Sequence, residues 1–122
     1  MEIETRTING VKIAVANSSD IIISDVTSAI DFIATVSYET GCAAVILNKE
    51  AVSEEFFDLS TKIAGEILQK FVLYRMKLAV VGDFSVYSSK SLKDFIYECN
   101  KGNDLFFVAD EAMAEEKLSA LR

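Results

Sequence analysis

The alternation of hydrophobic and polar positions predicts five short strands along the chain. Residues 2–8 and 11–16 form two strands around Asn9-Gly10, the strongest short-range signal for a β-hairpin. Three brief apolar runs have the length and composition of strands covered on both faces. They lie at residues 42–47, 77–81 and 105–108. The shorter run Ile21-Ile22-Ile23 fits either an extended bridge or a buried corner.

Apolar residues spaced three or four apart predict four helices between and after these strands. The helices cover residues 26–40, 53–71, 92–101 and 111–121. The residues expected to cap them are Ser24 or Asp25, Ser91 and Asp110 at the starts, and Gly41 and Gly102 at the ends. In the second helix the inner face consists of Phe56, Leu59, Ile63, Ile67, Leu68 and Phe71. Gly65 interrupts this helix at a cost of about 1 kcal/mol relative to alanine, and we expect it to allow a neighbour to pack closely.

The order of elements indicates the fold class. Repeated strand–helix units with short connections favour right-handed crossovers and a parallel sheet. We therefore expect residues 1–122 to form a single α/β domain with a five-stranded, mostly parallel sheet and about four helices. The N-terminal hairpin adds an antiparallel strand, which we expect at an edge of the sheet.

Charge and composition exclude several classes of function. With 19 acidic and 12 basic residues the formal charge is −7, which is unsuited to binding a phosphate backbone. No apolar run reaches the roughly 20 residues that a membrane helix needs, and residues 1–10 lack the apolar segment of a signal peptide. These features predict a cytoplasmic protein without nucleic-acid or membrane partners.

Side chains that commonly support catalysis are scarce. Histidine is absent, which removes the commonest general base and the commonest metal ligand. Two distant cysteines, Cys42 and Cys99, do not form a zinc motif, and we expect both to be reduced and buried. The five glycines do not form a phosphate-binding loop. We therefore predict no catalytic residue, no metal ligand and no cofactor.

Acidic residues follow several of the predicted strands. Asp83, with Ser85 close behind it, leaves the strand at residues 77–81, and Asp20, Glu50 and Asp110 follow other strands. Because the carboxyl ends of parallel strands share one edge, these carboxylates could converge on a Mg²⁺ ion. Acids at strand ends also cap turns and helices. On that interpretation, which we favour, the Asp83 carboxylate accepts backbone N–H groups of the loop at residues 85–91.

A second candidate surface lies where the helix at residues 53–71 begins. Phe56 and Phe57 are either interface anchors or lids on the core, and the loop aromatics Phe84 and Tyr87 leave the same alternatives open. Asp58, Ser60 and Thr61 follow directly. Ser60 or Thr61 either caps the helix or forms part of a partner-facing surface that phosphorylation would alter.

Two stretches carry a family resemblance. FFDLSTKIAGEILQKF and KLAVVGDFSVYSSKSLKDFIYECNKG resemble a family of small bacterial proteins catalogued only as a domain of unknown function. The similarity spans nearly the whole chain, with GEILQKF, VGDFS, SLKDFIYE and NKG at the spacing of that family. The family name implies no activity.

The element order also resembles the STAS fold of anti-sigma factor antagonists. In that fold a phosphorylatable Ser or Thr lies where the helix after the third strand begins, which corresponds here to the region of Asp58, Ser60 and Thr61. The usual Asp-Ser-Ser-Gly run is replaced by FFDLSTKIAG. This resemblance implies a regulatory role.

The sequence therefore supports two alternative functions. The first, which we favour, is a non-enzymatic regulatory or protein-interaction module of STAS-like type, with protein partners or a second copy of the chain. The second is a small-ligand-binding or metal-dependent enzyme with its site around Asp83.

Overall fold

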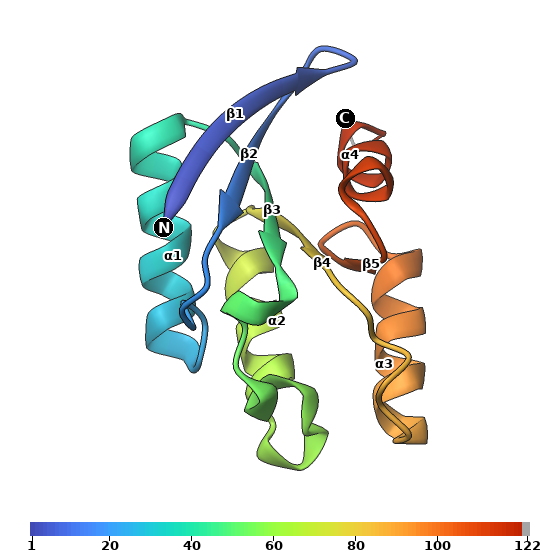
Figure 1. Cartoon of the computed structure of the whole chain (residues 1–122). Coiled ribbons are helices and arrows are strands. Elements are labelled where there is room, and N and C mark those ends of the chain that lie inside the picture. The colour runs from blue at the N-terminus through green and yellow to red at the C-terminus, as the bar shows by residue number, and fades with distance from the viewer. Residues whose placement is uncertain (121–122) are drawn as a thin grey trace.

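The computed structural model describes residues 1–120, and its centre is a five-stranded sheet in the order β1-β2-β3-β4-β5 (Figure 1). The strands are β1 (Glu2–Ile8), β2 (Val11–Asn17), β3 (Ala44–Asn48), β4 (Lys77–Val81) and β5 (Leu105–Val108). β1 pairs antiparallel with β2, and the three other pairings are parallel. The α/β fold class, the antiparallel hairpin and its position at an edge are all confirmed.

The hairpin forms as its sequence predicts. Asn9 and Gly10 both have positive φ angles, 52° and 80°. A two-residue turn of this kind matches the right-handed twist of the flanking strands. The register therefore runs without a break from Ile8 opposite Val11 to Glu2 opposite Asn17.

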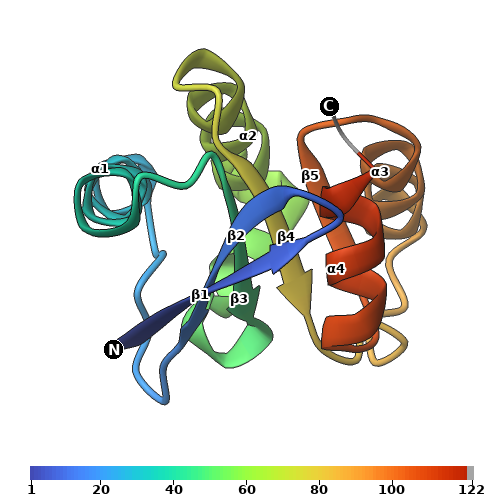
Figure 2. The ribbon, with the colours of Figure 1, turned by 90° about the horizontal axis from the view of Figure 1, so that it is seen from above.

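Four α-helices cover the two faces of the sheet. They are α1 (Val26–Thr40), α2 (Ile63–Leu73), α3 (Lys90–Lys101) and α4 (Glu111–Ser119). Because β2 to β5 follow one another in order, right-handed crossovers place α1, α2 and α3 on the same face, and α4 covers the opposite face (Figure 2). Each face of the sheet therefore has its own hydrophobic core, formed by alternate strand residues. Val45 and Leu47 face α1 and α2, whereas Ala44 and Ile46 face α4.

This strand order has a consequence for ligand binding. Open α/β sheets bind ligands in the crevice that forms where the strand order reverses. In this sheet the order of the parallel strands never reverses. The topology therefore provides no such crevice at the carboxyl edge.

The predicted helix at residues 53–71 is wrong in its first half. Two 3₁₀ turns, Glu54–Phe57 and Leu59–Thr61, precede α2. The side chains of Ser53 and Asp58 accept backbone N–H groups and each start a new turn, a local alternative to helix that such residues commonly offer. Lys62 then has a left-handed φ of 64°, so the helix itself begins at Ile63.

Most of the predicted helix ends are confirmed. Asp25 and Asp110 cap α1 and α4, and α1 and α3 end at Gly41 and Gly102. The prediction of Ser91 as a cap is wrong, since the Ser89 hydroxyl accepts the Leu92 N–H at 3.2 Å. The predicted final helix residue, Leu121, lies outside the described residues.

The predictions for the run at residues 21–23 and for Gly65 had different outcomes. Ile23 forms a parallel bridge with Val52 and is buried, so Ile21-Ile22-Ile23 includes both a bridge and a buried corner. The expected close packing at Gly65 is wrong. This glycine is exposed, and a Cβ atom built on it would meet nothing within 4 Å.

Candidate functional site

The loops that follow β3 and β4 meet at the carboxyl edge of the sheet in a cluster of aromatic rings. Phe57 stacks on Tyr87 with ring centroids 5.0 Å apart and lies 5.8 Å from Phe84. Phe56 contacts Phe57 edge-on, and both rings reach Phe107 of β5. Phe56 and Phe57 are only 2% and 4% exposed. In this structure both rings are lids on the core, as one of the two alternatives expected.

Lys49, which sequence reasoning missed, crosses this cluster. Its Nζ lies 4.8 Å from the centroid of the Tyr87 ring and 3.9 Å from a carboxylate oxygen of Glu54. A Cβ atom on Gly82 would lie 2.5 Å from the Lys49 Cβ. Glycine at position 82 therefore lets the Lys49 stem pass over the end of β4. The tyrosine hydroxyl donates to Glu54 at 2.8 Å, and burial together with this acceptor raises the pKa of Tyr87.

Asp83 and Ser85 form a closed local turn. The Ser85 hydroxyl and backbone N–H both donate to Asp83 Oδ1, the N–H at 2.9 Å. These two donors, the hydroxyl first, lower the pKa of the Asp83 carboxyl. The prediction that the Asp83 carboxylate accepts a backbone N–H group of this loop is confirmed.

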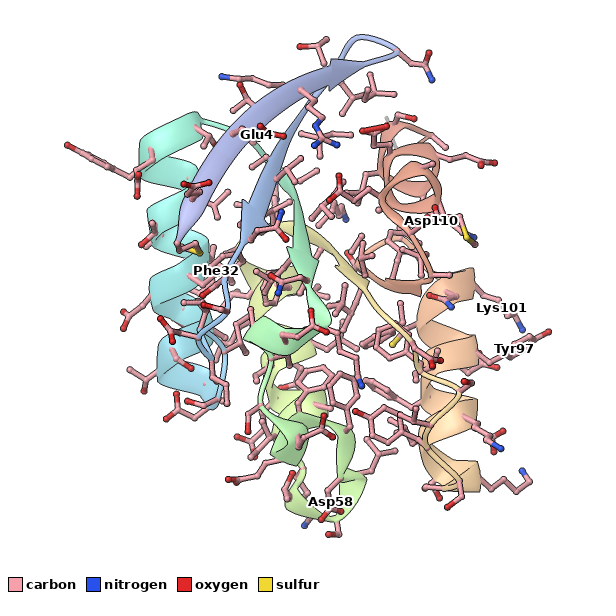
Figure 3. The ribbon with its side chains drawn as sticks, viewed as in Figure 1. Glu4, Phe32, Asp58, Tyr97, Lys101 and Asp110 are labelled. Atoms are coloured by element: carbon pink, nitrogen blue, oxygen red, sulfur yellow. The ribbon has the colours of Figure 1, made fainter. Side chains whose placement is uncertain are left out.

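Asp58, Ser60 and Thr61 form a similar turn at the tip of the molecule, where Figure 3 labels Asp58. The Asp58 carboxylate accepts the Ser60 hydroxyl at 2.6 Å and the Ser60 N–H at 3.1 Å, and these bonds lower the pKa of Asp58. The Thr61 hydroxyl accepts the N–H of Ile63, the first residue of α2, at 3.3 Å. Thr61 thus helps to cap α2, whereas Ser60 is exposed and its hydroxyl donates to Asp58.

The acidic residues after the strands do not converge. Among residues 1–120, no group of three or more His, Cys, Asp or Glu side chains is close enough to hold a metal ion. Asp83 bonds within its own loop, and the Asp110 carboxylate accepts the Met113 N–H at 2.8 Å to cap α4. The expected convergence of Asp20, Glu50, Asp83 and Asp110 is therefore not seen among residues 1–120. Asp20 and Glu50 line one open pocket at this edge, but neither Asp83 nor Asp110 lines it.

A small cavity with both polar and apolar lining lies at the carboxyl edge, on the face that α4 covers. Its volume is about 260 Å³, and its polar lining comes from Asn17, Asn48, Glu50 and Glu111. Asn48 is held in place because its side chain accepts the Ser18 N–H at 2.9 Å and donates to the Ser18 carbonyl at 2.7 Å. Two amides and two carboxylates suit a small polar or cationic ligand.

A different surface exposes large apolar side chains, and we call it the α1–α2 surface. It comprises Ile30, Ala34 and Tyr38 of α1 with Leu73 of α2 and Tyr74, which ends α2. Tyr38 is 92% exposed and Leu73 63% exposed. A groove of about 210 Å³, lined by Ile30, Ala34 and Tyr74, runs between the two helices. The sequence feature that indicates this surface is the run Val72-Leu73-Tyr74, because it places apolar residues outside the buried stripe of α2.

The two cysteines are free thiols. Cys42 is buried as predicted, but Cys99 is only partly buried. Burial, followed by the nearby charges of Asp104 and Glu98, raises the pKa of Cys99 from 9.0 to about 11. A thiol of this kind is a weak nucleophile at neutral pH.

Within residues 1–120, no helix has both the length and the apolar character needed to cross a membrane.

The chain was compared with protein families, curated proteins and solved structures. No curated protein and no solved structure matches it. The family described as a domain of unknown function, DUF4180, matches residues 8–118. This match covers every helix and strand except β1, most of which precedes residue 8, and the end of α4, and on this basis the chain belongs to the DUF4180 family.

Proposed function

We propose that the protein is a non-enzymatic interaction module that binds a protein partner through its α1–α2 surface. The observation that carries the proposal is an apolar groove between α1 and α2 that is lined by the half-exposed Tyr74. Tyr38 and Leu73 are exposed on the same two helices. Contiguous exposed apolar groups on a soluble domain are typical of protein-binding sites. Tyrosine is also among the residues enriched in such interfaces.

Charges at the border of the surface add specificity. Asp31 lies three residues before Ala34, and Lys70 lies three and four residues before Leu73 and Tyr74, so these charges flank the apolar groups on their helices. Among residues 1–120, neither Asp31 nor Lys70 forms an ion pair. A partner with an apolar centre and one charge of each sign at its rim fits this arrangement.

The exposed hydroxyl of Ser60 supports a regulatory element. A phosphate on Ser60 would replace the hydrogen bond to Asp58 with repulsion between like charges. The turn at residues 58–61 would then open near the first residues of α2. This proposal follows the STAS resemblance and rests on analogy of topology.

The test compares partner capture by two variants with equal exposure of the changed side chain. Leu73→Asp introduces a charge into the α1–α2 surface. Tyr97→Asp introduces the same charge on the outer side of α3, where Tyr97 is also 63% exposed (Figure 3). We expect both variants to keep the circular dichroism spectrum of the wild type. Proteins captured from the native cytosol should be lost with Leu73→Asp and retained with Tyr97→Asp; equal capture by both variants would contradict the proposal.

A second candidate function is supported by the cavity at the carboxyl edge. Its lining by Asn48, Glu50 and Glu111 suits a small polar ligand, whereas the Asp83 loop does not reach it. The test is a thermal-shift screen of small amines and amino acids on the wild type and on Glu50→Gln. A ligand that raises the melting temperature of the wild type alone would favour this function over the first.

A further inference from the structure

The outer edge of β1 has backbone groups that nothing in the described chain covers. A two-residue hairpin closes on a hydrogen-bonded pair, here Ile8 and Val11, and such pairs alternate along the ladder. The N–H and C=O groups of the even-numbered residues of β1 therefore face β2. Those of Ile3, Thr5 and Thr7 face outward, and no residue in the range 1–120 bonds to them.

The opposite edge of the sheet is protected. The Asn100 side chain of α3 accepts the Phe107 N–H at 2.8 Å and donates to the Phe107 carbonyl at 3.1 Å. One side chain thus satisfies both groups that this residue of β5 would offer to another strand. β1 has no comparable cover, and its seven residues contain no proline, no lysine and no bulge. Its charged residues are Glu2, Glu4 and Arg6, so any strand that pairs with this edge must match these charges.

The sequence of β1 is complementary to itself. In an antiparallel pair centred on Thr5, the Thr5 residues of two copies face each other and exchange both hydrogen bonds. Glu4 of each copy then lies opposite Arg6 of the other, on the same face of the sheet. Ile3 lies opposite Thr7, so all outward groups of both strands are paired.

Other registers allowed by the hydrogen-bond pattern lack this match. Centring the pair on Ile3 places Glu2 opposite Glu4, and like charges directly opposite destabilise a strand pair. Centring it on Thr7 leaves Arg6 opposite Ile8 and removes half of the strand from the pairing. Centring the pair on Glu4 or on Arg6 places that residue opposite its own copy, which again sets like charges directly opposite each other. Of these registers, the charges therefore favour the one centred on Thr5.

We propose that β1 is a dimerisation edge, at which a second copy of this chain adds its own β1 in antiparallel orientation about Thr5. The two sheets join into one sheet of ten strands. Glu4 is exposed, and its carboxylate contacts Arg6 of its own strand at 2.6 Å (Figure 3 labels Glu4). Arg6 also pairs with Glu111 and Glu115 of α4 at 2.8 and 3.0 Å. In the dimer, Glu4 of the second copy therefore approaches a guanidinium group that these three carboxylates already hold in place. A strand pair alone buries less than a standard interface, and we expect a dimer that dissociates in the micromolar range.

The test uses a proline substitution that removes a hydrogen-bond donor from the outer edge of β1 and leaves the pairing with β2 intact. Thr5→Pro removes the outward N–H at the centre of the pair, whereas the ladder to β2 uses no hydrogen bond from Thr5. Thr5→Ala is the matched control, because it removes the side chain and keeps the N–H. Sedimentation and light scattering would be measured from about 1 mM to about 1 µM protein.

We expect the wild type and Thr5→Ala to be dimeric at high concentration and Thr5→Pro to be monomeric throughout. Glu4→Arg, which places two arginines opposite each other, should weaken the dimer at least tenfold. Hydrogen exchange on the wild type gives an independent measure that needs no variant. The amides of Ile3, Thr5 and Thr7 should be protected at high concentration and should exchange rapidly when the protein is diluted.

Three results would overturn the inference. The wild type could remain monomeric over the whole concentration range. A dimer could persist in folded Thr5→Pro, which would indicate another surface such as the α1–α2 surface. The amides of Ile3, Thr5 and Thr7 could exchange at a rate independent of concentration, and this last result holds even if Thr5→Pro does not fold.

Discussion

Removing the Asn100 side chain tests how the free edge of β5 is stabilised. In Asn100→Ala both hydrogen bonds to the Phe107 backbone are lost, while Phe107 itself stays in the core at 4% exposure. Each intramolecular hydrogen bond contributes about 0.5–1.5 kcal/mol net, so the gross loss is about 1–3 kcal/mol. Alanine regains about 0.6 kcal/mol in helix propensity within α3. The free energy of unfolding should therefore fall by about 0.4–2.4 kcal/mol.

Urea unfolding followed by circular dichroism measures this change. The slope of free energy against urea should stay constant, so that the shift in midpoint reports stability alone. Asn103→Ala is the matched control, because Asn103 is exposed and makes no side-chain hydrogen bond within residues 1–120. Its effect should stay within about 0.5 kcal/mol. If Asn100→Ala were as stable as the wild type, the Phe107 backbone would be satisfied by water, and the argument that Asn100 covers the edge would fail.

Four further predictions concern the core, the helices and the loops. Ile67→Ala should lower the free energy of unfolding in urea by about 2–5 kcal/mol, because Ile67 is fully buried between α2 and the sheet. Gly65→Ala should raise it by about 0.5–1 kcal/mol, because the added Cβ meets nothing and the helix gains propensity. In a Cys42→Ala background, Cys99 should react with iodoacetamide at pH 8 about 100-fold more slowly than a thiol of pKa 9, as its pKa of about 11 implies. Asp83→Asn should lower the melting temperature at pH 7 equally with and without Mg²⁺. Folding lowers the pKa of the Asp83 carboxyl, so its contribution to stability is present above the ordinary pKa of 3.8 and is lost as the pH falls through the folded value.

Each of these predictions has a clear contrary result. A loss well below 1 kcal/mol for Ile67→Ala would place this residue outside the core. Destabilisation by Gly65→Ala would reveal a close contact that the structure does not contain. Rapid labelling of Cys99 would mean that the thiol is not desolvated. Stabilisation of the wild type by Mg²⁺, absent in Asp83→Asn, would restore the metal-site hypothesis.

Local signals in the sequence determined the elements that depend on neighbouring residues. Asn9-Gly10 predicts the hairpin because only residues that tolerate positive φ make this turn. Asp25 and Asp110 cap helices through bonds to residues three positions away, so their role is visible in the sequence itself. The apolar runs of the central strands are likewise local, since burial on both faces requires nearly every residue to be apolar.

Other features depend on contacts between distant segments and were decided only in the tertiary structure. Phe56 and Phe57 match a helical stripe, yet they fill the space above Phe107, fifty residues further along the chain. Asn100 has no helical or capping signal, and its role arises only because α3 runs beside the free edge of β5. The acidic residues after the strands share one edge by topology, but the Asp83 carboxylate bonds within its own loop and the Asp110 carboxylate caps α4. Hydrophobic periodicity specifies which face of an element is buried, whereas the partner that covers this face is set by the order and handedness of the connections.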